Sequence, residues 1–265
     1  MRTLLVLTVL VGAPCAARAD DDVTFVTLDR QDGVSRAGAE VSFVALDDFG
    51  DGVPQSAMRF DSHAQSVNLR TGLGAYAAIP VTVYSQSGAS ASGALGNIEL
   101  GGLFARSLQP GLDVIVHAGL VLPSSPPGDD NHSELAQPSR LTDALLGQAP
   151  PVALRLAGAM RYRHDRLLAR VDLGLDQGFV RFNELDYSIG LRVASAIGWD
   201  FGVALPAVEL VGLFYDPSTS RTTITAALSV RARVSRAQPY AALIIPFQDR
   251  YFAAALTLGV DVVLP

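Results

Sequence analysis

Apolar and polar side chains alternate along several stretches of this chain, each about ten residues long. Between 152 and 163, one set of alternate positions is apolar or glycine and the other set carries arginine: Val152, Leu154, Leu156, Gly158, Met160 and Tyr162 oppose Arg155, Arg161 and Arg163. A period of two separates these sets onto the two faces of an extended strand. In a helix the arginines would lie all around the circumference, so the pattern favours a strand.

Three further segments repeat this alternation, at 167–176, 222–234 and 252–264. A tilted strand of about 9–11 residues is long enough to cross a bilayer, and these segments have that length. Less regular alternation predicts additional strands at 67–79, 97–107, 112–122, 187–195, 199–214 and 238–246.

The connections alternate in length, as in outer-membrane barrels, which join strands by tight periplasmic turns and longer outer loops. The expected long links are 80–96, 123–150, 177–186 and 215–221, and the short turns QPG, HD, IGW and RAQ lie between them. We therefore predict an all-β fold, an antiparallel transmembrane β-barrel of about 12 strands.

Two interpretations of the amino-terminal part keep the strand number even. Either 39–47 and 57–63 are strands, or 23–29 and 39–47 are strands and 57–79 forms one long strand. A soluble β-sandwich is the alternative fold, because its strands alternate as well. The purity of the apolar faces, the arginines and aspartates opposite them, and the phase of the turns favour the barrel.

The first 19 residues have the parts of a secretory signal peptide: Arg2, an apolar run from Leu4 to Val11, and the cleavage site Ala17-Arg18-Ala19. We expect an exported chain with a signal peptide at 1–19 and one barrel domain at 20–265, in the outer membrane of a Gram-negative bacterium. The only cysteine, Cys15, lies in the leader, which excludes a disulfide framework and a thiolate site from the mature chain.

Composition supports distributed rather than continuous hydrophobicity, since 49% of residues are hydrophobic and no later stretch could form a spanning helix. All 20 basic residues are arginine, and the net charge of -6 gives no general attraction to nucleic acid. The expected partners are outer-membrane lipid, a small-molecule solute, and the barrel-assembly machinery during biogenesis.

If the apolar faces meet lipid, the charged faces line the lumen, because a charge on the lipid face costs about 2–4 kcal/mol at the bilayer midplane. Such residues form either a structural ladder of ion pairs or the lining of a pore for polar or anionic solutes. Glu209 is a further candidate partner for the arginines. The predicted lumen-facing residues are Arg70, Glu99, Asp113, His117, Arg155, Arg161, Arg163, Arg170, Asp172, Arg192, Arg231, Arg233 and Asp261.

Nothing in the sequence predicts a catalytic, cofactor or metal site. The histidines are scattered, and neither His132-Ser133 nor His164-Asp165 can orient a base on a nucleophile, since the members of each pair are adjacent. The acidic run 47–52 lacks the distal glutamate of a calcium loop and reads as a turn. Aromatic residues near strand ends predict an interfacial girdle: Tyr187, Trp199, Tyr215, Tyr240 and Tyr251.

Two short motifs carry a family resemblance. One contains Gly96, Asn97, Ile98, Leu100 and Gly101, and the other is Leu122-Pro123-Ser124, while RAQPYAALIIPF from Arg236 is similar to the family's penultimate strand. They resemble outer-membrane channels named as transporters of the phenol-degradation meta pathway. The resemblance implies a barrel related in kind to fatty acid and aromatic hydrocarbon channels. The chain departs from these in having Ala94 at the leading glycine, no Asn-Pro-Ala plug motif and no terminal aromatic residue.

The leading functional hypothesis is a passive channel for small molecules. The second is a non-conducting barrel with a structural role or a role in surface interaction through the 123–150 loop. An outer-membrane hydrolase is third.

Overall fold

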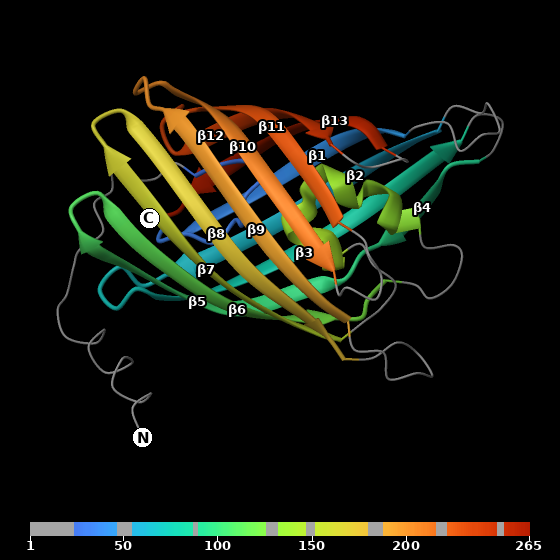
Figure 1. The fold of residues 1–265 in the computed structure, drawn as a ribbon, viewed down its shortest axis with the longest axis horizontal. Coiled ribbons are helices and arrows are strands. Elements are labelled where there is room, and N and C mark those ends of the chain that lie inside the picture. The colour runs from blue at the N-terminus through green and yellow to red at the C-terminus, as the bar shows by residue number, and fades with distance from the viewer. Residues whose placement is uncertain are drawn as a thin grey trace.

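The computed structural model is a closed β-barrel (Figure 1). It describes residues 24–46, 55–86, 90–125, 132–146, 152–179, 188–215, 222–247 and 252–265. The signal peptide predicted at 1–19 lies outside these residues. The strands are β1 (Arg36–Leu46), β2 (Gln55–Val67), β3 (Leu73–Gln86), β4 (Ser92–Leu95), β5 (Ile98–Gln109), β6 (Leu112–Leu122), β7 (Ala153–His164), β8 (Leu167–Gly178), β9 (Ser188–Trp199), β10 (Ala204–Tyr215), β11 (Thr222–Ala232), β12 (Ala237–Pro246) and β13 (Phe252–Val263).

Twelve of the described strands form the barrel wall, and each pairs antiparallel with its neighbours. The pairing of β2 with β3 closes the sheet, and the short β4 adds to the loop end of β3 beside β5. Closure leaves the wall without a free edge, which a bilayer requires because lipid cannot satisfy unpaired backbone groups. The predicted fold class is confirmed.

The amino-terminal strands follow the first of the two interpretations. The described part of 23–29, residues 24–29, is not a strand. Residues 57–79 are not one long strand, because a turn at 68–72 separates β2 from β3. The predicted long link 80–96 was wrong for its first half, since β3 continues to Gln86 and β4 follows. Alternation missed these residues because Pro80 and a run of small side chains interrupt the pattern.

Five short turns lie at one end of the barrel, which we call the turn end (Figure 1). The strand ends that border the longer connections lie at the opposite end, the loop end. Two predicted turns were displaced. Trp199 still belongs to β9 and the turn follows it at 200–203, where Gly202 has a φ of +85°. Likewise β12 begins at Ala237, and Ser235 takes a φ of +58° in the turn before it. By the rule for this class, the turn end is periplasmic.

The two faces of the wall meet different surroundings, as the alternation predicted. Leu173 and Leu228 are 57% and 60% exposed on the outside. Asp172 and Arg231, one and three positions away, are each only 3% exposed and face the interior. A soluble sandwich would show the reverse, so this distribution excludes it.

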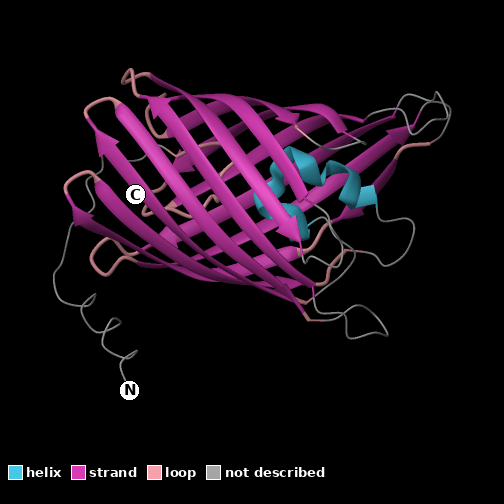
Figure 2. Cartoon of the chain, viewed as in Figure 1, coloured by secondary structure: helices cyan, strands magenta, loops and turns pink. Residues whose placement is uncertain are grey.

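Two segments outside the wall fill the interior. Residues 24–35 precede β1, and the helical segment η2 (His132–Leu146) lies between β6 and β7 within the barrel (Figure 2). Phe25, Leu28 and Leu141 form an apolar cluster with wall residues including Leu168 and Leu205. No helix among the described residues is long and apolar enough to span a bilayer.

The outward orientation of β8 gives a first prediction. Replacing Leu173 by arginine puts a charge on the lipid-facing side near mid-strand, which costs up to about 2–4 kcal/mol in a bilayer. We expect Leu173→Arg to lower the yield of folded, heat-modifiable protein on refolding into lipid vesicles. Leu173→Phe, which keeps the position apolar, serves as the control and should fold like the wild type. Equal yields for both variants would contradict the lipid-facing assignment.

Candidate functional site in the barrel lumen

The two interior segments meet inside the lumen. Arg140 of η2 donates from Nη1 to the carbonyl oxygen of Val26 at 2.6 Å and from Nη2 to that of Leu28 at 3.0 Å. Thr142 adds a hydrogen bond from its hydroxyl to the carbonyl oxygen of Thr27 at 3.1 Å. One segment ends at the turn end, where β1 begins, and η2 is attached at the loop end, so the two segments reach the lumen from opposite ends of the barrel.

Glu209 on β10 fixes the amino-terminal segment to the wall. Its carboxylate accepts the backbone N–H groups of Val26 at 2.9 Å and Thr27 at 2.6 Å, and the Thr27 hydroxyl at 2.8 Å. Ser229 on β11 donates to the same carboxylate. Glu209 was a predicted ion-pair partner for arginine, but its described contacts are with backbone N–H and hydroxyl groups instead.

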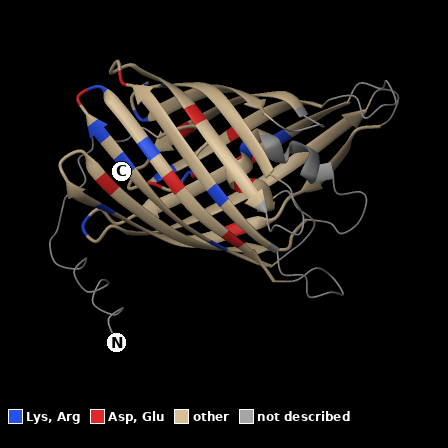
Figure 3. Cartoon of the chain, viewed as in Figure 1, with Lys and Arg blue, Asp and Glu red and all other residues tan. Residues whose placement is uncertain are grey.

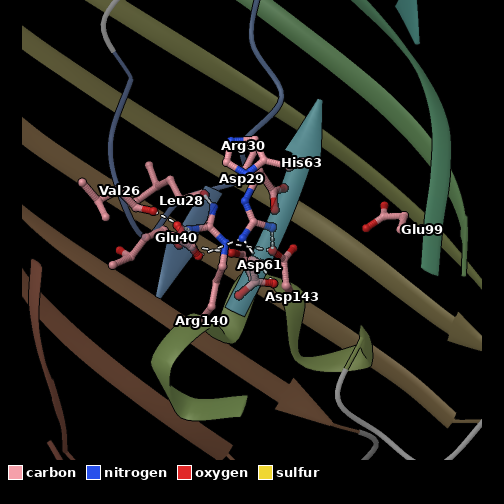
Figure 4. Close-up of polar contacts among 12 residues, drawn as sticks. Val26, Leu28, Asp29, Arg30, Glu40, Asp61, His63, Glu99, Arg140 and Asp143 are labelled. Carbon is pink, nitrogen blue, oxygen red and sulfur yellow. Dashed lines mark hydrogen bonds and ion pairs between the residues drawn. The ribbon is translucent and has the colours of Figure 1, made fainter. Parts of the chain in front are cut away.

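Arg30 binds one side of the lumen wall (Figure 4). Its guanidinium lies 2.8 Å from Glu40 on β1 and 3.5 Å from Asp61 on β2, and it also pairs with Asp143 of η2. Arg140 shares two of these carboxylates, at 3.3 Å from Glu40 and 2.8 Å from Asp143. These buried charges are therefore neutralised by partners from both interior segments and the wall.

Asp29, the preceding residue, binds other wall strands. Arg192 Nη1 on β9 lies 2.6 Å from Asp29 Oδ1, and His117 Nε2 on β6 lies 3.1 Å from Oδ2. Tyr76 on β3 contacts His117 Nδ1 at 3.2 Å and donates to Glu99 at 2.8 Å. The neighbouring opposite charges Asp29 and Arg30 thus fasten one segment to two different parts of the wall.

The carboxylates of Asp29 and Asp143 remain ionised at neutral pH because arginines surround them. Burial by itself would raise the pKa of the Asp29 carboxyl, but Arg192 and other neighbours hold that pKa below its usual range. Burial likewise opposes ionisation of Asp143, and Arg30 and Arg140 hold the pKa of its carboxyl well below the ordinary value. The site is therefore a set of paired charges.

A further cluster lies towards the turn end around Asp261 of β13. Arg231 Nη1 lies 2.6 Å and His63 Nε2 2.8 Å from its carboxylate, and Arg36 Nη1 lies at 3.5 Å. The Arg231 guanidinium also stacks 4.3 Å from the centre of the Tyr240 ring. This cluster ties β2, β11 and β13 to the start of β1.

Figure 3 shows that charged residues are spread over many strands of the wall. Most of the predicted lumen residues are buried inside the barrel. The buried ones are Glu99, His117, Arg155, Arg161, Arg170, Asp172, Arg192, Arg231 and Asp261. Asp113 is partly buried 2.7 Å from Arg161, and Arg163 and Arg233 lie at the turn end, 3.6 and 2.8 Å from Asp200. Whether any of them lines an open pore stays a prediction.

Arg70 was wrongly placed in the lumen. It lies in the turn between β2 and β3 and is exposed. The prediction extended the alternation of 67–79 through a turn, where the period of two has no meaning. Tyr240 was also misplaced, since it is buried inside and donates to Glu40 at 2.7 Å, whereas Trp199 is exposed at the end of β9.

Some expectations fall outside the described part of the chain. Tyr187, Tyr251, the acidic run 47–52, and the side chains of Tyr215, His132 and Ser133 belong there. His164 is described: it is the exposed last residue of β7 and lies 3.7 Å from Asp165 in the turn that follows. Within the described residues, no group of histidine and carboxylate side chains could hold a metal ion.

Sequence reasoning missed the interior segments because they have no period. Asp29 falls in 23–29, which only one of the two interpretations made a strand, and Arg30 follows it. Arg140 and Asp143 fall in the predicted outer loop 123–150. The wall partners on β2 had a usable signal, since polar residues occupy every second position from Arg59 to Gln65. The sequence held no signal for the position of Tyr76, because a lone tyrosine among alanines does not indicate a polar face.

The two motifs of the family resemblance contact each other and η2. Ser124 Oγ donates to the Gly96 carbonyl at 2.7 Å and accepts the Ile98 N–H at 3.0 Å. Asn97 is fully buried, its backbone N–H donates to the Leu146 carbonyl at 2.7 Å, and its side chain donates to that of Leu145 at 3.0 Å. These motifs therefore hold the carboxyl-terminal end of η2 against the wall.

No protein-family model matches the chain, and no curated protein sequence matches it. Solved structures do. The match to an outer-membrane channel from Pseudomonas putida F1 has 12% identity and a TM-score of 0.62, over 87% of this chain and 96% of that one. The KdgM porin matches with 10% identity and a TM-score of 0.56, over 87% and 99%. The NanC porin matches with 6% identity and a TM-score of 0.51, over 87% and 100%.

This chain is an outer-membrane β-barrel. The likeness to these porins and channels is one of fold, and the apolar outer face of the wall agrees with a position in that membrane.

The shared carboxylate of Asp143 gives a second prediction. Asp143→Asn leaves Arg30, Arg140 and Arg155 short of a buried partner, which costs up to about 3–5 kcal/mol for a buried pair. We expect a lower midpoint temperature for heat-modifiable migration on a gel. Asp165→Asn, an exposed turn substitution, is the control and should leave the midpoint unchanged.

The same variant should change the response to acid. Because the folded pKa of Asp143 is depressed, its stabilisation is present above the unfolded pKa of about 3.9 and is lost as pH falls below it. Wild-type protein should therefore lose more of its midpoint temperature between neutral and acidic pH than Asp143→Asn does. Identical pH profiles would show that Asp143 does not carry this stabilisation.

Proposed function

We propose that the protein is a passive outer-membrane channel for small polar molecules, closed in this structure by residues 24–35 and η2. The observation that supports it most is that the lumen is occupied by two segments separate from the wall. Ion pairs and hydrogen bonds to polar wall residues fasten each segment, in addition to the apolar contacts that Phe25, Leu28 and Leu141 make with the wall. A barrel that only had to be rigid could fill its lumen with wall side chains alone.

Polar contacts between the interior segments and the wall are compatible with a closed channel that can open. Removing a buried apolar plug exposes apolar surface to water, whereas separated ion pairs can be rehydrated. The desolvation cost of a buried ion pair largely offsets its attraction, so the net stabilisation by these pairs is modest. Opening then requires water to replace the interior segments at their wall contacts.

The sequence resemblance to phenol-degradation channels supports transport as the role. The motifs that carry it include Asn97 and Ser124, which belong to the contact that seats η2. The porins and the channel of similar fold support the same class. The resemblance alone would suggest an aromatic solute, whereas the charged lumen favours solutes with polar groups.

A non-conducting structural barrel is the second candidate, and the filled, charge-paired lumen favours it. The role in surface interaction through the 123–150 loop loses support, because the described side chains at 139–146 are buried inside the barrel. We propose no enzymatic activity, since the described histidines contact carboxylates and tyrosines. Lipid around the wall and insertion by the barrel-assembly machinery remain parts of the proposal.

Deleting the β6–β7 connection tests the channel. Val121 pairs with Ala153 at the loop end, so a short Gly-Ser turn can replace residues 124–151 and leave both strands paired. The deletion removes one buried cation and one buried anion of η2, Arg140 and Asp143, which keeps the interior charge balanced. In planar bilayers, we expect brief, rare openings for the full chain and sustained current for the deletion.

A matched control replaces only residues 126–131 and keeps η2, and it should behave like the full chain. If neither the full chain nor the deletion conducts at any voltage, the structural barrel is the correct reading. The deletion must retain heat-modifiable migration for its current to be interpreted.

A further inference from the structure

Three wall residues around Asp29 form a preorganised binding site for a carboxylate. Arg192, His117 and Arg155 come from β9, β6 and β7, and their nitrogens lie 2.6, 3.1 and 3.8 Å from the Asp29 carboxylate. All three wall residues are buried. Asp29 itself belongs to the interior segment that the proposed opening would move, so the site and its present occupant are separable.

Arg192 has donor capacity beyond this contact. Its Nε lies 2.9 Å from Asp176 and its Nη1 donates to Asp29, but its Nη2 is buried without a hydrogen-bond partner in the described part of the chain. Were Asp29 to leave, both terminal nitrogens would lack an acceptor. Two adjacent N–H groups of a guanidinium match the two oxygens of a carboxylate, which makes a bidentate anion the fitting ligand.

The surrounding wall holds Arg192 in this position. Gly174 on β8 lies directly across from it in the register, and a Cβ there would come within 2.6 Å of Arg192 Nη2. The glycine therefore makes room for the guanidinium against the wall. On the other side, Tyr76 packs edge-on against His117 with ring centroids 5.6 Å apart and fixes the imidazole facing Asp29.

We infer that Arg192, with Arg155 and His117, is the lumen's binding site for the carboxylate of a small acidic solute, and that Asp29 occupies this site while the channel is closed. The inference rests on the proposed channel function and names its solute class. Exchange of one carboxylate for another leaves no buried arginine unpaired, which avoids the large cost of breaking a buried pair. The solute and the closing segment therefore compete for one site.

Chemical rescue of Asp29→Gly tests the site. The substitution removes a carboxymethyl group, and acetate is the matching free carboxylate. We expect the full-length variant, refolded in detergent, to have a lower midpoint temperature for heat-modifiable migration than the wild type. Sodium acetate should raise that midpoint by a few degrees, increasing with the logarithm of its concentration, at constant ionic strength. Acetamide, of similar size and uncharged, should leave it unchanged.

Two double variants test whether acetate stabilises the protein by binding at Arg192. Asp29→Gly with Arg192→Gln should lose the response to acetate. Asp29→Gly with Arg231→Gln should keep it, because Arg231 is an equally buried wall arginine that pairs with Asp261 instead. The inference is overturned if acetate stabilises wild type and Asp29→Gly equally, if acetamide acts as acetate does, or if the response survives in the Arg192 double variant.

Conductance separates this inference from the proposed function. In planar bilayers, glucuronate should reduce the chloride current through Asp29→Gly more than glucose does, and Arg192→Gln should abolish that difference. A chain that responds to acetate but never conducts would overturn the channel and leave the carboxylate site in place. A chain that conducts without any response to acetate or preference for glucuronate would overturn the site and leave the channel.

Discussion

Every strand of a closed sheet in a bilayer has one face in hydrocarbon and one face towards the lumen, and this constraint determines where the charges of the chain can go. Arg155, Arg170 and Arg192 are excluded from the outer face, so they are buried inside a barrel too narrow to hydrate them freely. A buried guanidinium is tolerated only with a partner. The carboxylates of the wall and of the interior segments are therefore required by the same alternation that makes the outside apolar.

Wall carboxylates alone would be enough to pair many of these arginines, as Asp172 does for Arg170 at 2.7 Å. The interior segments add a second layer of partners. Asp29 and Arg30 are adjacent in sequence yet bind different parts of the wall, so displacing this segment breaks contacts with β1, β2, β6 and β9 together. Arg140 and Asp143 extend the network to η2. Closure is thus a property of the whole network.

Nearly all of the wall strands could be predicted from the sequence, but almost none of the lumen contents could. Alternation reports one local fact, the difference between two faces of a strand, so it located β6 to β13 within a few residues wherever that difference was strong. It failed at Arg70, where the chain turns, and at Tyr240, whose large apolar ring resembled a girdle residue although its hydroxyl binds Glu40. Asp29 contacts Arg192, 163 residues away in the sequence, and Asp143 contacts Arg30, 113 residues away. A single sequence has no local signal for such contacts.

Small residues in the wall are the part of this architecture that connects fold to specificity. Gly174 admits the Arg192 guanidinium, and Gly119 faces the Tyr76 hydroxyl and the Glu99 carboxylate, which a Cβ would approach within 2.4 Å. In both cases a polar group from another strand occupies the space that a side chain at the glycine would fill. A lumen lined in this way can hold large charged groups flat against the wall. The interior volume left between them is what the two segments occupy, and it is the volume that a solute would need.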